Sequence, residues 1–317
     1  MSASILIYEP DSARAARTYG EAVAREFPDL PVVATADLAE ALAAAPRATV
    51  IAGKAQDIRP ELVAASPRLE WIQALTTGVD PLHSMPIPAS VTITSARGIH
   101  GPQMAELALL FMLALARGLP KMLANQQAAK WQRWGQPLLR GKTLVVLGVG
   151  SISEVLAACC RPFGLHLVGL SSRGSAAGFD EVHPRSALKV VAARADFLVV
   201  LVPYSPETHH LVGAEVLAAM KPSAFLINIA RGNVIDESAL IAALRARRIA
   251  GAGLDVFSTE PLPPDSPLWT LDNVILTPHI GGLSDVYVEQ VIPVLIENLR
   301  AFRAGDRSRM RNVVVRV

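Results

Sequence analysis

Short apolar runs alternate with alanine-rich helical patterns along the whole chain, and this alternation limits the possible folds more than any other feature. A strand that is followed by a helix and then another strand is typical of a parallel pair, because the helix carries the chain back across the sheet. The pattern therefore predicts an α/β protein with helices on both faces of parallel sheets. A first series of expected strands lies at residues 5–8, 31–35, 48–52, 69–75 and 91–94.

A second series of apolar runs follows a long helical pattern at 102–119. Six such runs with helices between them predict a doubly wound nucleotide-binding domain. A length of 317 residues is typical of about two domains. The last amphipathic stretch, 285–303, follows the second series, and we expect it to pack on the N-terminal domain. The runs of the second series are 143–148, 165–170, 197–201, 225–230, 251–256 and 274–278.

Composition excludes several classes of partner. The net charge is only +2 and the basic residues are scattered, so we expect no nucleic-acid partner. The longest apolar run, 107–116, is shorter than the roughly 20 residues that span a bilayer, and the N-terminus lacks the pattern of a signal peptide. The adjacent Cys159 and Cys160 fit core packing in a reducing compartment. We therefore expect a cytoplasmic protein with no membrane partner and no metal site.

A glycine turn follows the first strand of the second series. Gly148, Gly150, Ser151 and Ile152 form the junction between that strand and a helical pattern. The first glycine allows a tight turn, the second lets the backbone approach a pyrophosphate, and the helix N-terminus supplies N–H donors. Ser153 replaces the third glycine of this fingerprint. The turn predicts dinucleotide binding, and the alternative is a plain strand–turn–helix.

The residues after the next strand indicate which dinucleotide binds. NAD-binding domains usually carry Asp or Glu there, whereas this chain has Ser171, Ser172 and Arg173. Hydroxyl groups and a guanidinium would bind a 2′-phosphate that a carboxylate would repel. We therefore expect a preference for NADP(H), with NAD(H) as the alternative cofactor. A solvated surface charge is the other interpretation of Arg173.

Three polar residues follow three separate strands of the second series. Arg231, Glu260 and His279 come after the runs at 225–230, 251–256 and 274–278. Ligands of open α/β sheets bind at the carboxyl ends of the strands, so the three side chains are expected in one crevice. Arg binds a carboxylate, His exchanges a proton with a carbonyl oxygen, and Glu favours the charged imidazole. Taken singly, each residue could instead be a surface charge, a turn residue or a structural histidine.

Five segments together resemble the D-isomer-specific 2-hydroxyacid dehydrogenase family. The resemblance covers nearly the whole chain, and its departures are Ser153 and the missing acidic residue near 171–173. It implies two doubly wound domains with an active-site cleft between them. The substrate-binding domain would comprise 1–98 and 283–317, the dinucleotide-binding domain 99–282, and dimers would form through the helix region 100–120. The segments are ARGIHGPQMAELALLFMLALAR (96–117), VVLGVGSIS (145–153), NIARGNVIDESAL (228–240), GAGLDVFSTEPLP (251–263) and TPHIGG (277–282).

The resemblance also implies residue roles. Arg231 matches the substrate-binding arginine, Glu260 the acidic partner of the catalytic histidine, and His279 the general acid/base. Asp255 matches a residue near the nicotinamide carboxamide. Backbone amides around Thr77 and Gly78 match a loop that holds the substrate carboxylate, and Leu75 is added to the substrate set. The remaining cofactor candidates are Val202, Pro203, Thr208, Ala230 and Gly281.

Trp134 lies on the stretch 131–139, between the long helix and the second series of strands. It is expected either to pack in a core or interface, or to cap the substrate pocket of a partner subunit. Similarity to glyoxylate/hydroxypyruvate reductases motivates the second interpretation.

The expected activity is reduction of a small 2-oxo acid to the D-2-hydroxy acid, with glyoxylate or hydroxypyruvate as substrate. A phosphoglycerate-type dehydrogenase is one alternative, although the chain lacks room for an additional regulatory domain. A dinucleotide-sensing scaffold without significant turnover is the other alternative.

Overall fold

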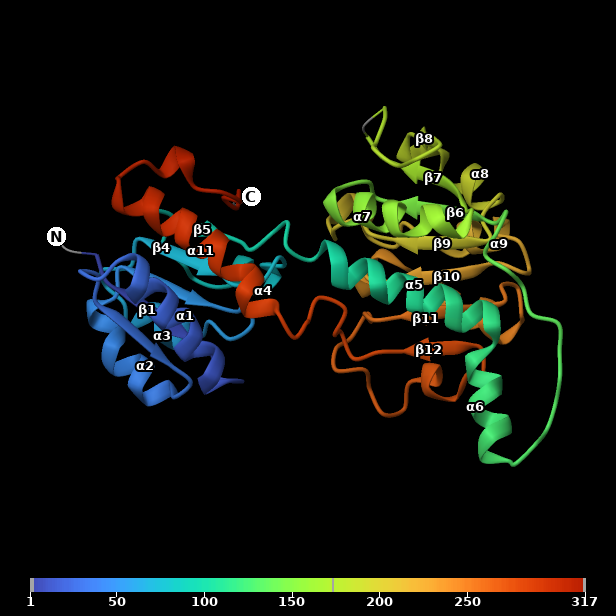
Figure 1. Cartoon of the computed structure of the whole chain (residues 1–317), viewed down its shortest axis with the longest axis horizontal. Coiled ribbons are helices and arrows are strands. Elements are labelled where there is room, and N and C mark those ends of the chain that lie inside the picture. Colours follow the sequence, from blue (N-terminus) through green and yellow to red (C-terminus); the bar gives the residue numbers. More distant parts are fainter. Residues whose placement is uncertain (1–2, 173, 316–317) are drawn as a thin grey trace. The chain divides into compact units, whose positions relative to one another are not determined.

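The structure is a computed structural model that describes residues 3–172 and 174–315. The chain divides into two compact units (Figure 1). The first unit contains Met1–Ile99 and Ser284–Val317, so it is built from both ends of the chain. The second unit is the continuous stretch His100–Leu283.

The first unit contains a five-stranded parallel sheet in the order β2-β1-β3-β4-β5. The central strands β1, β3 and β4 are buried at every position, as expected for strands covered on both faces. Helices cover the sheet on both sides, with α1 and α11 in one core cluster and α2, α3 and α4 in the other. The strands are β1 (Ile5–Tyr8), β2 (Val32–Thr35), β3 (Val50–Gly53), β4 (Trp71–Ala74) and β5 (Thr92–Thr94), and the helices are α1 (Ala13–Glu26), α2 (Leu38–Ala44), α3 (Pro60–Ala64), α4 (Asp80–His83) and α11 (Tyr287–Arg303).

Helix α11 is joined to the first unit by buried polar contacts as well as by apolar packing. The Tyr287 hydroxyl donates to the backbone oxygen of Leu75 at 2.7 Å. The Asn298 side-chain amide is fully buried and donates to Gln73 Oε1 at 2.8 Å. Buried polar groups are costly unless they are paired, so these contacts fix the position of the helix on the sheet.

The second unit contains a seven-stranded parallel sheet in the order β12-β11-β10-β9-β6-β7-β8. The chain moves outward from β6 to β7 and β8 and then returns to β9 on the other side of β6. The carboxyl ends of β6 and β9 therefore form the switch point at which doubly wound sheets bind ligands. The strands are β6 (Thr143–Leu147), β7 (His166–Leu170), β8 (Glu181–His183), β9 (Phe197–Val200), β10 (Phe225–Asn228), β11 (Gly251–Leu254) and β12 (Val274–Leu276).

The sequence pattern predicted six of these strands and missed β8. This strand is only three residues long, is half-buried and carries Glu181 and His183 around one valine. It pairs with β7 at the edge of the sheet. A short polar edge strand has too little apolar periodicity to be recognised from sequence.

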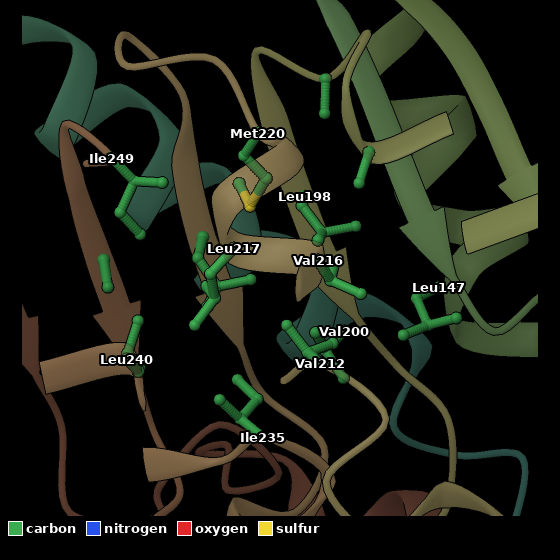
Figure 2. Packing of buried hydrophobic residues seen from close by; sticks show 14 of the residues in the cluster. Leu147, Leu198, Val200, Val212, Val216, Leu217, Met220, Ile235, Leu240 and Ile249 are labelled. Carbon is green, nitrogen blue, oxygen red and sulfur yellow. The ribbon is translucent and has the colours of Figure 1, made fainter. Parts of the chain in front are cut away.

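Two hydrophobic clusters cover the two faces of the second sheet. Alternate residues of β6 enter different clusters: Leu144 and Val146 pack with α5 and α7, whereas Val145 and Leu147 pack with α8, α9 and α10. Figure 2 shows part of the latter cluster, in which Val216, Leu217 and Met220 lie against Leu198 and Val200. Each such buried side chain stabilises the fold by about 1.5–3 kcal/mol. The helices are α5 (Gly101–Arg117), α6 (Leu119–Gln127), α7 (Ser151–Cys160), α8 (Leu188–Ala192), α9 (Ala214–Ala219) and α10 (Glu237–Arg245).

Helix α5 ends at Gly118, which has a positive φ of 72°, and the chain then bends by 62° into α6. Within the described residues, no single helix is long and apolar enough to cross a membrane, whereas α5 and α6 pass that test of length and composition only as a bent pair. Most of α5 is buried, and Phe111 lies directly against β11. A Cβ at Gly253 would be 2.6 Å from Phe111 Cγ, so this helix–strand contact requires glycine.

Candidate active site

Arg231, Glu260 and His279 lie at the carboxyl edge of the second sheet. Arg231 follows β10, Glu260 lies in the loop after β11, and His279 lies in the loop after β12. These three strands are neighbours in the sheet, and adjacent strands are about 4.8 Å apart. The strand order therefore brings together three residues that are far apart in sequence.

Glu260 and His279 form a direct pair. His279 Nδ1 lies 2.6 Å from Glu260 Oε2, and the other carboxylate oxygen accepts the backbone N–H of Phe257 at 2.9 Å. An ionised carboxylate can only accept, so His279 Nδ1 carries a proton in this contact. The pair leaves His279 Nε2 as the ring nitrogen that can exchange a proton with a ligand.

The pair also changes the pKa values of both groups. The hydrogen bond that His279 donates to Glu260 raises the pKa of His279, and the net shift stays upward despite the lowering caused by burial and by the positive charge of Arg231. Burial raises the pKa of Glu260, but the hydrogen bonds from His279 and Phe257 outweigh it, and the pKa lies below its usual range. The imidazole is thus stabilised in its charged, proton-donating form.

Arg231 is half-buried in a loop that Asn228 organises. The Asn228 side chain is 1% exposed, accepts the Ala230 N–H at 3.1 Å and donates to the backbone oxygen of Arg231 at 3.0 Å. Burial, followed by the positive charge of Arg231, lowers the pKa of the buried His100 to about 4. His100 is therefore neutral near the guanidinium at physiological pH.

Gly232 is a site residue that the sequence patterns did not single out. A Cβ at this position would lie 1.9 Å from the backbone carbon and oxygen of Phe257. The loops after β10 and β11 can touch only because residue 232 is glycine. Since the Phe257 N–H also holds Glu260, this contact links the placement of Arg231 to that of Glu260. The only sequence signal was a glycine directly after Arg231.

The predicted glycine turn has the shape of a phosphate cradle. Gly148 has a φ of +104°, and a Cβ there would be 2.7 Å from the backbone nitrogen of Val202. The space beside Gly150 is open, with no atom within 4 Å of its Cβ position among the described residues. Helix α7 begins at Ser151, directly after this glycine, and the N-terminus of a helix is a favourable place for an anion. Ser153, in place of the third glycine, is buried and accepts the Gly150 N–H at 2.6 Å.

The other cofactor candidates lie along the same carboxyl edge. Ser171 follows β7, is buried, and donates its N–H to the backbone oxygen of His183 at 2.9 Å, whereas Ser172 is exposed. Arg173 lies outside the described residues.

Thr208 shapes the loop after β9. Its side chain is 2% exposed, and its hydroxyl accepts the Ser205 N–H at 2.7 Å and lies 2.9 Å from the Pro203 oxygen. The remaining candidates are Ile152 in α7, Val202 and Pro203 after β9, Ala230 after β10, Asp255 after β11 and Gly281 after β12.

The substrate candidates of the first unit follow β4. Leu75 is buried, and its backbone oxygen accepts the Tyr287 hydroxyl. Thr76 Oγ1 donates to the Gly78 oxygen at 2.8 Å and accepts the Ala55 N–H at 3.3 Å. Thr77 and Gly78 are half-buried in this turn.

Trp134 packs at the far end of α5. Its ring lies against Gly118, and Lys121 Nζ is 4.5 Å from the ring centroid. His100 and Gly282 meet at the other end of this helix, and 17 residues span about 25 Å at 1.5 Å per residue. Trp134 therefore does not join Arg231, Glu260 and His279 of its own chain. A role at a pocket depends on a partner subunit, and that role and the homodimer stay predictions.

Among residues 3–172 and 174–315, no group of three or more His, Cys, Asp or Glu side chains could hold a metal ion.

Known proteins include relatives of this chain. Residues 109–281 match the family model for the NAD binding domain of D-isomer specific 2-hydroxyacid dehydrogenases. Glyoxylate/hydroxypyruvate reductase B of Yersinia pestis is 35% identical over 82% of this chain and 82% of its own length. D-3-phosphoglycerate dehydrogenase of Methanocaldococcus jannaschii is 33% identical over 80% of this chain but only 49% of its own length.

Solved structures show the same architecture over the whole chain. A D-isomer specific 2-hydroxyacid dehydrogenase family protein from Aeromonas salmonicida is 33% identical, with a TM-score of 0.91 and full coverage of both chains. A D-isomer specific 2-hydroxyacid dehydrogenase from Xanthobacter autotrophicus, in complex with NADPH and MES, is 29% identical with a TM-score of 0.82. That alignment covers 99% of this chain and 98% of the other.

The doubly wound sheet, together with the match to an NAD binding domain of dehydrogenases, defines a nicotinamide-dinucleotide-dependent oxidoreductase. More narrowly, the chain belongs to the D-isomer specific 2-hydroxyacid dehydrogenase family.

Proposed function

We propose that this protein reduces a small 2-oxo acid to the D-2-hydroxy acid, with NADPH as the preferred cofactor. The observation that carries the proposal is the 2.6 Å pair of His279 and Glu260 on the same sheet edge as Arg231. A proton donor with a raised pKa beside a guanidinium suits a substrate that carries both a carbonyl group and a carboxylate.

The roles of the residues follow from their contacts. Arg231 binds the substrate carboxylate, and its positive charge polarises the neighbouring carbonyl group. His279 donates its Nε2 proton to the carbonyl oxygen, which becomes the hydroxyl oxygen of the product. Glu260 holds the imidazole by Nδ1 and stabilises its charged form before the transfer. The nicotinamide, when bound, supplies the hydride that the carbonyl carbon accepts.

The proposed cofactor preference rests on the residues after β7. Neither Ser171 nor Ser172 is acidic. Ser172 is exposed after β7, which pairs with β6, the strand that leads into the glycine turn. Charge-assisted hydrogen bonds to a 2′-phosphate contribute about 1.5–3 kcal/mol, which corresponds to roughly 10- to 100-fold. The NADPH complex of the Xanthobacter autotrophicus relative supports this proposal.

We expect kcat/KM to be roughly 10- to 100-fold higher with NADPH than with NADH. Ser172→Asp should reverse this preference, because a carboxylate repels the 2′-phosphate and accepts a ribose hydroxyl instead. Ser172→Ala is the matched control and should keep the wild-type order. Initial rates with both cofactors test the prediction, and a wild-type preference for NADH would refute it.

Glyoxylate and hydroxypyruvate are the proposed substrates, and the similarity to the Yersinia pestis reductase supports them. A phosphoglycerate-type activity is the second candidate, motivated by the Methanocaldococcus jannaschii relative. Comparing kcat/KM for glyoxylate, hydroxypyruvate, pyruvate and 3-phosphohydroxypyruvate separates the two. We expect the highest values with the first two substrates, and the highest value with the phosphorylated acid would favour the second candidate.

Glu260→Gln should change the pH dependence of 2-oxo-acid reduction. The charged His279 is the proton donor, so kcat/KM falls as pH rises through its pKa. Glu260 raises that pKa in the wild type, so the fall should occur at lower pH in the variant. Profiles of kcat/KM against pH for the two proteins provide the measurement. Identical alkaline limbs would contradict the assigned role of Glu260.

A further inference from the structure

The turn that follows β4 in the first unit has three carbonyl groups fixed by hydrogen bonds. The Thr76 oxygen accepts the Ala96 N–H at 2.9 Å, and the Gly78 oxygen accepts the Thr76 hydroxyl at 2.8 Å. The Leu75 oxygen accepts the Tyr287 hydroxyl at 2.7 Å. The first two donors belong to the N-terminal part of the unit, whereas Tyr287 lies in α11, 212 positions after Leu75.

The contact with Tyr287 fixes the direction of a whole peptide group. In a planar trans peptide, the C=O of one residue and the N–H of the next point in opposite directions. The Leu75 carbonyl group and the Thr76 N–H belong to one such peptide. Leu75 is fully buried and donates its own N–H to the Gly53 oxygen at 2.8 Å, so the peptide cannot turn freely. The Tyr287 hydroxyl therefore sets the direction in which the Thr76 N–H points.

The Thr76 N–H is available to a ligand. Among residues 3–172 and 174–315, it donates to no protein acceptor. Thr76 is half-buried and follows a parallel strand at its carboxyl end, where α/β sheets bind ligands. Backbone N–H groups in a turn attract anions, and a hydrogen bond from such a group to a carboxylate is strong. The position therefore suits the carboxylate of a 2-oxo acid.

Tyr287 is suited to hold this peptide. It is the first residue of α11, is 9% exposed and packs in the same hydrophobic cluster as Trp71 and Leu75. Burial raises the pKa of its hydroxyl, and the negative charge of Glu9 adds to the effect, so the hydroxyl keeps its proton and stays a donor. The ring alone would supply the packing, whereas the hydroxyl is the part that fixes the peptide.

We propose that Tyr287 is a positioning residue, whose hydroxyl orients the Leu75–Thr76 peptide so that the Thr76 N–H faces the substrate carboxylate. The inference rests on the proposed reduction of a 2-oxo acid. Tyr287 acts through the turn and does not itself bind the substrate. Loss of its hydroxyl should therefore weaken substrate binding and leave the cofactor site and the proton donor unchanged.

Tyr287→Phe is the first test, because it removes the hydroxyl and keeps the ring. A hydrogen bond to a charged group contributes roughly 10- to 100-fold in affinity, and the variant misdirects the Thr76 N–H without removing it. We expect KM for glyoxylate and hydroxypyruvate to rise by about 3- to 30-fold. Both kcat and the dissociation constant for NADPH should change less than about twofold, as expected when only substrate binding is weakened. Initial rates and fluorescence titrations provide these values.

Tyr19→Phe is the matched control. Tyr19 lies in α1, is 1% exposed and belongs to the same hydrophobic cluster as Tyr287, so this variant also removes a buried tyrosine hydroxyl from that core. It should leave KM unchanged, whatever either variant does to Tm. A KM in Tyr287→Phe that equals the wild-type value, or that rises no more than in Tyr19→Phe, would overturn the proposal.

Amide hydrogen exchange tests the same role without turnover. The Leu75 N–H is bound to the Gly53 oxygen and the Ala96 N–H to the Thr76 oxygen, so exchange at these two amides reports on the turn. Their exchange rates should rise in Tyr287→Phe and stay at wild-type values in Tyr19→Phe. Unchanged rates in Tyr287→Phe would contradict the proposal. A wild type that reduces no 2-oxo acid would refute the proposed function, and the exchange rates would still decide whether Tyr287 holds the turn.

Discussion

Replacing His279 with Ala is expected to lower kcat for 2-oxo-acid reduction by about 10²- to 10⁴-fold, the usual contribution of a general acid. The imidazole is the group that we assign to protonate the carbonyl oxygen, and Glu260, whose pKa lies below its usual range, is ionised and has no proton to donate. NADPH binding should persist, since the glycine turn after β6 does not depend on His279. Steady-state rates and NADPH titrations test the two halves of this prediction.

His83→Ala is a suitable control for His279→Ala. His83 is exposed at the end of α4 in the first unit and lies outside the loops after β10, β11 and β12 that carry Arg231, Glu260 and His279. Its replacement should leave kcat unchanged. Near-normal turnover in His279→Ala would show that another group donates the proton.

Arg231→Met is expected to lower kcat/KM by about 30- to several-thousand-fold, corresponding to the 2–5 kcal/mol typical of removing one partner of a hydrogen-bonded charge pair. The substrate carboxylate would lose its cationic partner in a half-buried site. Arg231→Lys should recover only part of the loss, because an ammonium group cannot make the two parallel hydrogen bonds of a guanidinium. Initial rates over a range of substrate concentrations provide kcat and KM.

The kinetics of Arg231→Met also show whether Arg231 binds the substrate. A large rise in KM for the 2-oxo acid with unchanged NADPH affinity fits the assigned role of Arg231. Unchanged KM and kcat in Arg231→Met would exclude the arginine from substrate binding.

Much of the fold could be predicted because buried parallel strands have a strong apolar pattern. The six apolar strands of the second sheet and the glycine turn after β6 each carry that local signal. The positions of Arg231, Glu260 and His279 could also be predicted, since each directly follows such a strand or its loop. Polar edge strand β8 lacks this signal, and the sequence pattern missed it.

Contacts between loops could not be predicted from the sequence. Gly232 and Phe257 meet because β10 and β11 are adjacent, and Asp255 binds Thr277 and Gly281 because β11 and β12 are adjacent. Each contact joins residues more than twenty positions apart, so no local pattern reports it. Similarly, the sequence indicates a hydroxyl at Thr208, but only the structure shows that this hydroxyl is occupied within its own loop.

The central claim is that the His279–Glu260 pair and Arg231 form a working catalytic site. The most direct test is the oxidation of NADPH by the purified protein in the presence of glyoxylate or hydroxypyruvate. We expect sustained turnover with kcat of roughly 1–10³ s⁻¹, the usual range for enzymes, and its loss in His279→Ala. Tight NADPH binding without turnover of any 2-oxo acid would contradict the account and favour a dinucleotide-sensing scaffold.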